Sequence, residues 1–168
     1  IRTDNYLTSQ PFEAGLLFNS YEESFDYIIG NPPYLKIGKN SSEALAMPEV
    51  CYGAPNLYFL FCAMGIRQLK TEAELVYIIP RSWTSGAYFQ RFRDYLHRYC
   101  AILHIHLFES RDKVFEGEKV LQETMIIKIR KTLKRHRNIS VTTSVGTDFR
   151  TITSFDALYR SVVSRDGF

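Results

Sequence analysis

The sequence predicts an α/β protein with a mostly parallel sheet, covered by helices and closed by an antiparallel hairpin. Short apolar runs typical of strands alternate twice with segments of helical periodicity, and two strand-like runs then follow in succession. Alternating strands and helices build parallel sheets through right-handed crossovers, whereas two successive strands can pair antiparallel. The length of 168 residues corresponds to about one domain.

The first strand and helix have clear local signals. Residues 25–30 form a short apolar run that is closed by Gly30 and two prolines, which predicts a buried strand. Residues 56–70 read as a helix with one core face, and Asn56 after Pro55 can serve as its N-cap. Its apolar positions recur at helical spacing: Leu57, Leu60, Phe61 and Met64.

The later elements follow the same logic. Residues 74–80 predict a second buried strand, and residues 88–98 predict a helix whose inward side chains are Phe89, Phe92 and Leu96. Strands are expected at 102–108 and 123–129, joined antiparallel through the polar loop 109–119. Residues 139–155 are rich in Thr and Ser, so we expect a linker or the edge of another unit there, not more of the same sheet.

Composition excludes several classes of protein. With 45% hydrophobic, 23% charged and 14% aromatic residues, the chain is neither disordered, collagen-like nor a coiled coil. No run of apolar residues is long enough to cross a membrane. Three cysteines without CxxC spacing favour a reducing, cytoplasmic setting over a disulfide scaffold. His104 and His106 share one face of a strand, but no further ligands stand at metal-binding spacing, so we expect no metal site.

A basic run lies between residues 128 and 137, with six Lys or Arg and no acid. Such a run either tracks nucleic-acid phosphates or forms a solvated strand end and loop. We take Lys134, Arg135 and Arg137 as candidate DNA-binding residues, and the solvated loop stays open as the alternative.

The motif that carries chemistry is the tetrapeptide Asn31-Pro32-Pro33-Tyr34, directly after the first strand. In open α/β sheets, ligands bind at the carboxyl ends of the strands. Two successive prolines stiffen the backbone and remove two N–H donors, which leaves a rim rich in acceptors. Asn31 adds a side-chain carbonyl, and Tyr34 adds an aromatic face with a polar tip.

Fixed acceptors beside an aromatic ring suit a planar group that carries an –NH2. Such an amine is a poor nucleophile because its lone pair is delocalised. Acceptors that bind both of its protons help it most when the nitrogen becomes tetrahedral and attacks a methyl donor. The motif therefore predicts N-methylation of a planar amine.

The tetrapeptide and its surroundings resemble the S-adenosylmethionine-dependent N6-adenine DNA methyltransferases of bacterial restriction–modification systems. The resemblance runs from about residue 1 to 131. It includes the strand and motif at 25–34, the helix start at 56–61, the strand, loop and helix at 76–80 and 93–96, and the hairpin residues 114–115 and 122–127. It implies a Rossmann-like methyltransferase fold, of which this chain is the C-terminal portion.

The resemblance also implies roles for single residues. Asn31 and the Pro32 carbonyl accept hydrogen bonds from the target amine, Pro33 stiffens the loop, and Tyr34 stacks on an adenine flipped out of double-stranded DNA. Asp4, in a short strand-and-acid segment at residues 1–7, is the candidate contact to the cofactor's adenine.

Other parts of the family's pattern are missing from the chain. The nine glycines never form GxG, so the glycine-rich cofactor loop is absent, and we expect a first strand and glycine turn ahead of Ile1. The closing hairpin offers no aromatic in 123–131, which leaves Phe115 as the nearest second aromatic. Trp83, the only tryptophan, either borders the cleft or is buried, and burial is the more common outcome for a tryptophan.

The expected division is residues 1–133 as the C-terminal part of the catalytic domain and 134–168 as a linker or the start of a target-recognition region. Expected partners are double-stranded DNA and a restriction nuclease and target-recognition domain, fused or separate, with no membrane. Three alternatives stay open. The same tetrapeptide occurs in enzymes that methylate a glutamine amide of a protein, related forms act on RNA, and the chain can be an inactive DNA-binding or interaction fragment.

Overall fold

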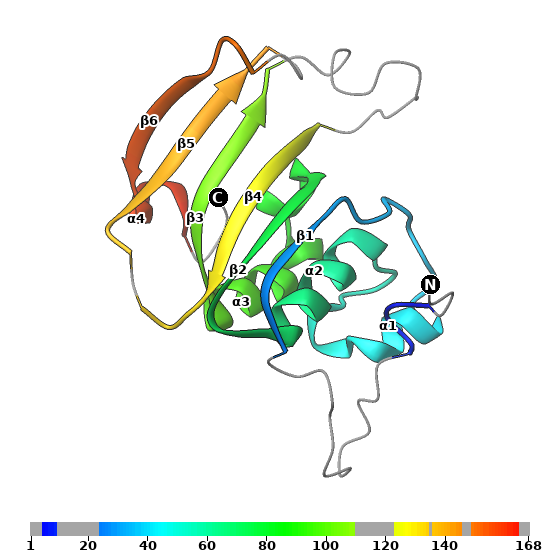
Figure 1. Cartoon of the computed structure of the whole chain (residues 1–168). Coiled ribbons are helices and arrows are strands. Elements are labelled where there is room, and N and C mark those ends of the chain that lie inside the picture. Colours follow the sequence, from blue (N-terminus) through cyan, green and yellow to red (C-terminus); the bar gives the residue numbers. More distant parts are fainter. Residues whose placement is uncertain (1–4, 10–23, 110–122, 135, 146–148, 165–168) are drawn as a thin grey trace.

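The computed structural model describes residues 5–9, 24–109, 123–134, 136–145 and 149–164. Within these residues, six strands form one mixed sheet in the order β1-β2-β4-β3-β5-β6, and helices α2 and α3 cover one of its faces (Figure 1). The predicted α/β class is confirmed. None of the helices in the described ranges is both long and apolar enough to cross a membrane.

The described chain runs through the following elements. The strands are β1 (Phe25–Gly30), β2 (Leu69–Pro80), β3 (Cys100–Phe108), β4 (Thr124–Lys131), β5 (Asn138–Ser144) and β6 (Thr153–Leu158). The helices are α1 (Ser42–Ala46), α2 (Leu57–Gln68), α3 (Gln90–Tyr99) and α4 (Tyr159–Val162), with 3-10 turns at Pro48–Val50, Arg81–Thr84 and Ala87–Phe89.

The pairing of the strands confirms the predicted antiparallel pair, but the described sheet is mixed instead of mostly parallel, because only two of its five strand pairs are parallel. β1 and β2 run parallel, β3 and β4 pair antiparallel as predicted, and β4 also pairs antiparallel with β2. β4 therefore lies between β2 and β3 instead of at the end of the sheet. The predicted connecting loop falls outside the described residues from residue 110 onward.

Strand β1 has the predicted bounds, but the prediction that it is buried is wrong. Tyr27 is 78% exposed and Ile29 is 84% exposed, whereas Ile28 on the other face packs against the core. The physical reason is that β1 pairs only with β2 in the described sheet, and the described helices cover only the face that carries Ile28. An apolar run identifies a strand without saying how many of its faces are covered.

Helix α2 begins where predicted, since the Asn56 side chain accepts a hydrogen bond of 3.3 Å from the Tyr58 N–H and caps its first turn. The expectation of a single core face is wrong, because side chains are buried almost all round the helix. The backbone approaches the sheet most closely at Gly65, where an added Cβ would stand 2.8 Å from Leu75 Cδ1. Helix α2 is thus packed against β2, and it also contacts α1, α3 and the 3-10 turn at Pro48–Val50.

Helix α3 begins close to the predicted position, and the inward positions Phe92 and Leu96 are buried while Phe89 is half-buried. The guanidinium of Arg93, also buried, donates to the Trp83 carbonyl at 3.1 Å and to Gln90 Oε1 at 2.7 Å. Arg93 therefore ties the turn after β2 to the helix that follows it.

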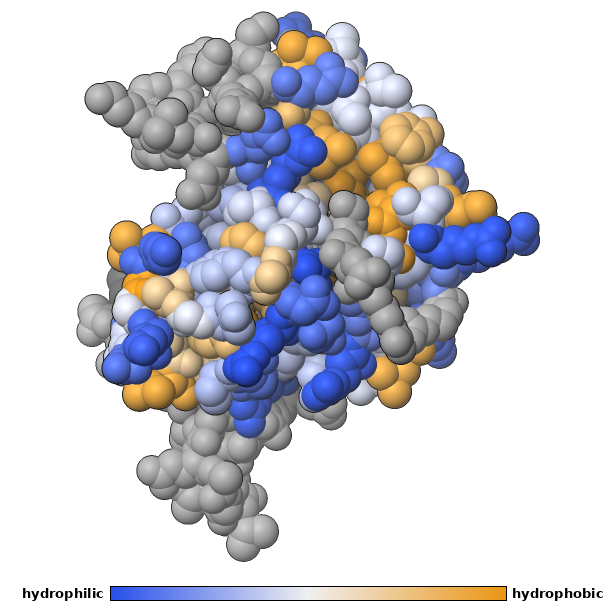
Figure 2. Space-filling model, turned by 180° about the vertical axis from the view of Figure 1, so that it is seen from behind, coloured by the Kyte–Doolittle hydropathy of each residue, from blue (hydrophilic) through white to orange (hydrophobic). Residues whose placement is uncertain are grey.

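The expectation that residues 139–155 do not continue the sheet is wrong. β5 pairs parallel with β3, and β6 pairs antiparallel with β5. Seen from behind (Figure 2), hydrophobic side chains gather on the side of these two strands, and Phe155, opposite the buried Val141, is 52% exposed. Neighbouring backbone groups extend a sheet even where the side chains are small and polar.

His104 and His106 share one face of β3, as predicted, and Ile105 between them belongs to the hydrophobic core. Both bind the Thr142 hydroxyl, at 2.7 and 2.8 Å, and His106 also binds the Ser144 hydroxyl at 3.0 Å. Burial lowers the pKa of both imidazoles, and the charge of Lys128 lowers that of His104 further. Among the described residues, no group of three or more His, Cys, Asp or Glu could hold a metal ion.

Candidate active site

The tetrapeptide Asn31-Pro32-Pro33-Tyr34 leaves the sheet at the carboxyl end of β1. The last paired residues are Gly30 and Tyr77, so the chain departs while β2 continues for three more residues to Pro80. Pro32 is buried, Tyr34 is half-buried, and Asn31 and Pro33 face solvent. The sequence therefore places this acceptor-rich loop where α/β sheets bind their ligands.

The Tyr34 hydroxyl joins the two ends of the motif to the sheet. It lies 2.7 Å from Asn31 Oδ1 and 2.9 Å from the Ile78 carbonyl oxygen. Ile78 comes just after Tyr77, the last β2 residue paired with β1. The Tyr34 hydroxyl therefore donates to a β2 carbonyl that lies beyond the end of the pairing with β1. One hydroxyl proton is shared by two acceptors, and each acceptor has two lone pairs, so Asn31 Oδ1 retains capacity for a second donor.

The ring of Tyr34 is fixed from the side as well as through its hydroxyl. Its centroid lies 6.3 Å from that of Tyr58 in an edge-to-face arrangement, a favourable geometry for aromatic pairs. Burial raises the pKa of Tyr34 to about 12, so the phenol stays protonated near neutral pH. The motif thus presents an oriented aromatic ring beside an oriented amide oxygen.

A small open hollow of about 210 Å³ adjoins the motif, lined by Lys36, Asn56, Tyr58, Ser82, Tyr88 and Phe89. Its walls are joined by backbone hydrogen bonds of 2.8 Å, from Leu57 N–H to Leu35 O and from Ile37 N–H to Pro55 O. Sequence reasoning singled out Asn56 only as a helix cap and missed the hollow. The hollow could not be predicted because three separate segments of the chain form it. The one local signal in the sequence was Lys36, two residues after the motif.

Of the predicted DNA-binding residues, Lys134 and Arg137 lie at the opposite end of the sheet from the motif. Lys134 and Arg137 stand in the connection from β4 to β5, and Arg135 lies outside the described residues. Because β4 runs antiparallel to β2, its end at Lys131 lies four residues, or roughly 13 Å, beyond Ile127, the residue level with the end of β1, and Lys134 follows that end. The structure therefore does not bring these residues to Asn31.

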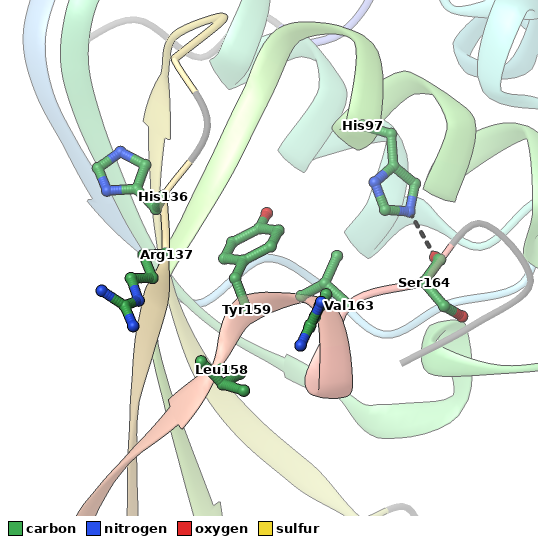
Figure 3. A pocket seen from close by; sticks show the side chains of 8 residues that line it. His97, His136, Arg137, Leu158, Tyr159, Val163 and Ser164 are labelled. Carbon is green, nitrogen blue, oxygen red and sulfur yellow. Dashed lines mark hydrogen bonds between the residues drawn. The ribbon is translucent and has the colours of Figure 1, made fainter.

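Lys134 has an acidic neighbour at that end, whereas Arg137 lies among basic and apolar side chains. Lys134 Nζ is 3.2 Å from Glu72 Oε1, and its side chain is 76% exposed. Arg137 lines a pocket of about 600 Å³ between the start of β5 and helix α4 (Figure 3). The pocket is lined by His97, His136, Arg137, Leu158, Tyr159, Arg160, Val163 and Ser164, without a carboxylate side chain.

Three further predicted residues have simple outcomes. Asp4 and Phe115 lie outside the described residues. Trp83 is fully buried against Phe92, which confirms packing over exposure at the cleft. Close to Asp4, residues 5–9 form a turn in which the Tyr6 hydroxyl donates to Gln68 Oε1 at 2.6 Å.

Comparison with known proteins shows close relatives. The chain is 38% identical over 143 residues to the type II methyltransferase M.BsuBI of Bacillus subtilis, covering 84% of this chain and 28% of that protein. It is 36% identical over 148 residues to the type II methyltransferase M.PstI of Providencia stuartii, covering 88% and 29%. The chain thus spans less than a third of the length of these relatives.

Solved structures show the same fold at low sequence identity. The type IIG restriction endonuclease BpuSI superimposes with a TM-score of 0.64 at 16% identity, covering 84% of this chain and 20% of that one. A Listeria monocytogenes protein assigned to the class I S-adenosylmethionine-dependent methyltransferases gives 0.59 at 19% identity, covering 80% and 40%. Residues 3–115, which include the whole Asn-Pro-Pro-Tyr loop and the hollow beside it, match the Eco57I restriction-modification methylases, and the chain belongs to that family.

Proposed function

We propose that this chain forms the target-base side of a DNA methyltransferase that transfers a methyl group to the N6 amine of an adenine flipped out of the duplex. The observation that carries the proposal is the pairing of Asn31 Oδ1 with the Tyr34 hydroxyl at 2.7 Å. It fixes an amide oxygen and an aromatic ring together at the carboxyl end of β1. Membership of a family of restriction-modification methylases supports DNA as the substrate.

Each residue of the motif has a task in this proposal. Asn31 Oδ1 and the Pro32 carbonyl accept the two protons of the amine, and Pro33 keeps the loop in one conformation. As the nitrogen becomes tetrahedral and partly positive, its protons become more acidic and these hydrogen bonds strengthen. Tyr34 stacks on the base, which offsets part of the few kcal/mol needed for flipping.

The methyl group comes from S-adenosylmethionine in this proposal. The sequence contains no GxG turn, so these residues do not by themselves form the usual cofactor site. We propose that the cofactor-binding half packs against β1, which has one unpaired edge in the described sheet and exposes Tyr27 and Ile29 on one face. The activity then belongs to the full-length protein, with Asp4 as a candidate contact to the cofactor and the cytoplasm as its location.

We also propose that Lys134, Arg135 and Arg137 contact DNA away from the flipped base. The length of β4 from the level of the motif to its end is roughly 13 Å, or about four base pairs of duplex, so one bound DNA can reach both places. Replacing all three by glutamine would flatten the salt dependence of DNA binding by about 0.9 per lost phosphate contact. An unchanged slope would return this run to a solvated loop.

Residues 134–168 divide between two roles in this proposal. β5 and β6 extend the sheet beyond β3, and the chain beyond them leads into a target-recognition region. A restriction nuclease, fused or separate, is the expected partner of such an enzyme. Neither assignment changes the chemistry proposed for Asn31.

The direct test is methyl transfer by the full-length protein from labelled S-adenosylmethionine to a mixture of duplex sequences. The DNA is then digested to nucleosides and analysed by mass spectrometry. The proposal predicts label in N6-methyladenine. Parallel reactions contain RNA or a protein substrate in place of the DNA. Label in cytosine, in RNA or in a protein glutamine would overturn the proposal in favour of another substrate, and no transfer to any of them would favour an inactive binding fragment.

A further inference from the structure

The hollow beside the motif is lined by donors. Asn56 lines the hollow, and because its amide oxygen accepts from the Tyr58 N–H, its –NH2 group remains as a donor. Tyr58 and Ser82 place two hydroxyls 3.2 Å apart. Lys36 adds an ammonium group, and the described residues give it no carboxylate partner. Donors with a single cation and no acid in the lining favour an anion as the occupant.

The size of the hollow restricts that anion. A volume of about 210 Å³ is below the 300–1,000 Å³ typical of sites for drug-sized ligands. It is also open on one side, as expected for a group that stays attached to a larger molecule. A phosphate group with its ester oxygens fits these two features better than a free nucleotide does.

The hollow is also firmly placed relative to the motif. Tyr58 touches the ring of Tyr34 on one side and lines the hollow on the other. A backbone bridge between Lys36 and Asn56 holds the loop after the motif against the start of α2. On the far side, the Tyr88 hydroxyl donates to the Ala54 carbonyl and fixes the remaining wall. A group bound here therefore keeps a set distance from a base stacked on Tyr34.

We propose that this hollow binds one backbone phosphate of the target strand next to the flipped nucleotide, with Lys36 as its cation. The proposal rests on the proposed function, because it takes the base at Tyr34 to belong to DNA. Holding the adjacent phosphate keeps the strand in place while the base rotates into the site. Phosphate contacts of this kind set position and register without reading the sequence.

The test uses the full-length protein and a series of duplexes that each carry one neutral methylphosphonate near the target adenine. For the wild type, one substitution adjacent to that adenine should weaken binding about 3- to 10-fold. Lys36→Gln should lose this sensitivity at that position alone, and its salt dependence should become flatter by about 0.9. Lys39→Gln is the matched control, because Lys39 is an exposed lysine of the same loop that does not line the hollow.

The outcomes separate this inference from the proposed function. If Lys36→Gln keeps the wild-type sensitivity, or if Lys39→Gln loses it equally, the phosphate is not held in the hollow. If neutral phosphates have no effect but removal of the neighbouring base does, a base occupies the hollow and the inference is wrong. Methylation of adenine by the wild type would survive either result, whereas absence of DNA binding by the wild type would contradict both proposals.

Discussion

Two substitutions of Tyr34 can separate the role of its hydroxyl, which is to orient Asn31, from the role of its ring, which is to stack on the base. Tyr34→Phe keeps the aromatic ring but removes the group that lies 2.7 Å from Asn31 Oδ1 and 2.9 Å from the Ile78 carbonyl. One hydrogen bond contributes about 0.5–1.5 kcal/mol net. If its role is to orient Asn31, the rate of methyl transfer should fall by about 2- to 13-fold, since 1.36 kcal/mol corresponds to a factor of ten.

Base stacking should survive this substitution and fail in Tyr34→Ala. Loss of the ring removes about 1–3 kcal/mol of stacking. The assay places the fluorescent base 2-aminopurine at the target position and compares its emission on binding with the single-turnover rate. Tyr34→Phe should keep the fluorescence rise and lose rate, whereas Tyr34→Ala should lose both. A Tyr34→Phe variant with the full wild-type rate would show that the hydroxyl does not position Asn31.

Three further predictions concern stability of the full-length protein. Burial is the main cause that lowers the pKa of His104 and of His106 below the ordinary value of about 6.5. The folded state therefore favours the neutral imidazoles, and the free energy of unfolding should decline as the pH falls through about 6.5. Thermal unfolding should show this decline, and replacing both residues by glutamine should flatten it between pH 5 and 6.5; an equal decline in both proteins would exclude these residues as its source. Asn56→Ala removes the cap of α2 and should lower the free energy of unfolding in urea by about 1 kcal/mol, with no change if the cap is dispensable. Gly65→Ala gains about 1 kcal/mol of helix propensity but crowds Leu75 by about 1–3 kcal/mol, so the urea midpoint should fall, and a rise would mean that Leu75 moves aside freely.

Much of the fold was predictable because local patterns agreed with it. The strand at 25–30, the cap at Asn56 and the inward positions of α3 all follow from apolar spacing and capping chemistry. Burial was less predictable. The exposure of Tyr27 and Ile29 depends on what covers that face of β1, which no local pattern records.

The strands β5 and β6 show a second limit. Their Thr and Ser residues favour a linker by composition, yet β5 pairs with β3 through its backbone and buries Ile139 and Val141 on one face. β6 is exposed along nearly its whole length and is held by the ladder with β5. Pairing of this kind depends on a neighbouring strand that is distant in the sequence.

The candidate site divides in the same way. The chemistry of the tetrapeptide at 31–34 could be predicted from the sequence, because the four residues are consecutive and two prolines restrict their backbone. The bond from Tyr34 to the Ile78 carbonyl joins residues 44 positions apart, and the hollow at Lys36 adds a third segment. These contacts come from packing of the loop against α2 and the end of β2.

The most direct measurement is the single-turnover rate of adenine methylation by the full-length protein and its Asn31→Ala variant. Loss of a preorganised acceptor should reduce the rate about 10²- to 10³-fold. Asn40→Ala, an exposed asparagine in the loop after the motif, serves as the control and should keep the wild-type rate. An Asn31→Ala variant that methylates adenine as fast as the control would contradict the central role given to the acceptor at the end of β1.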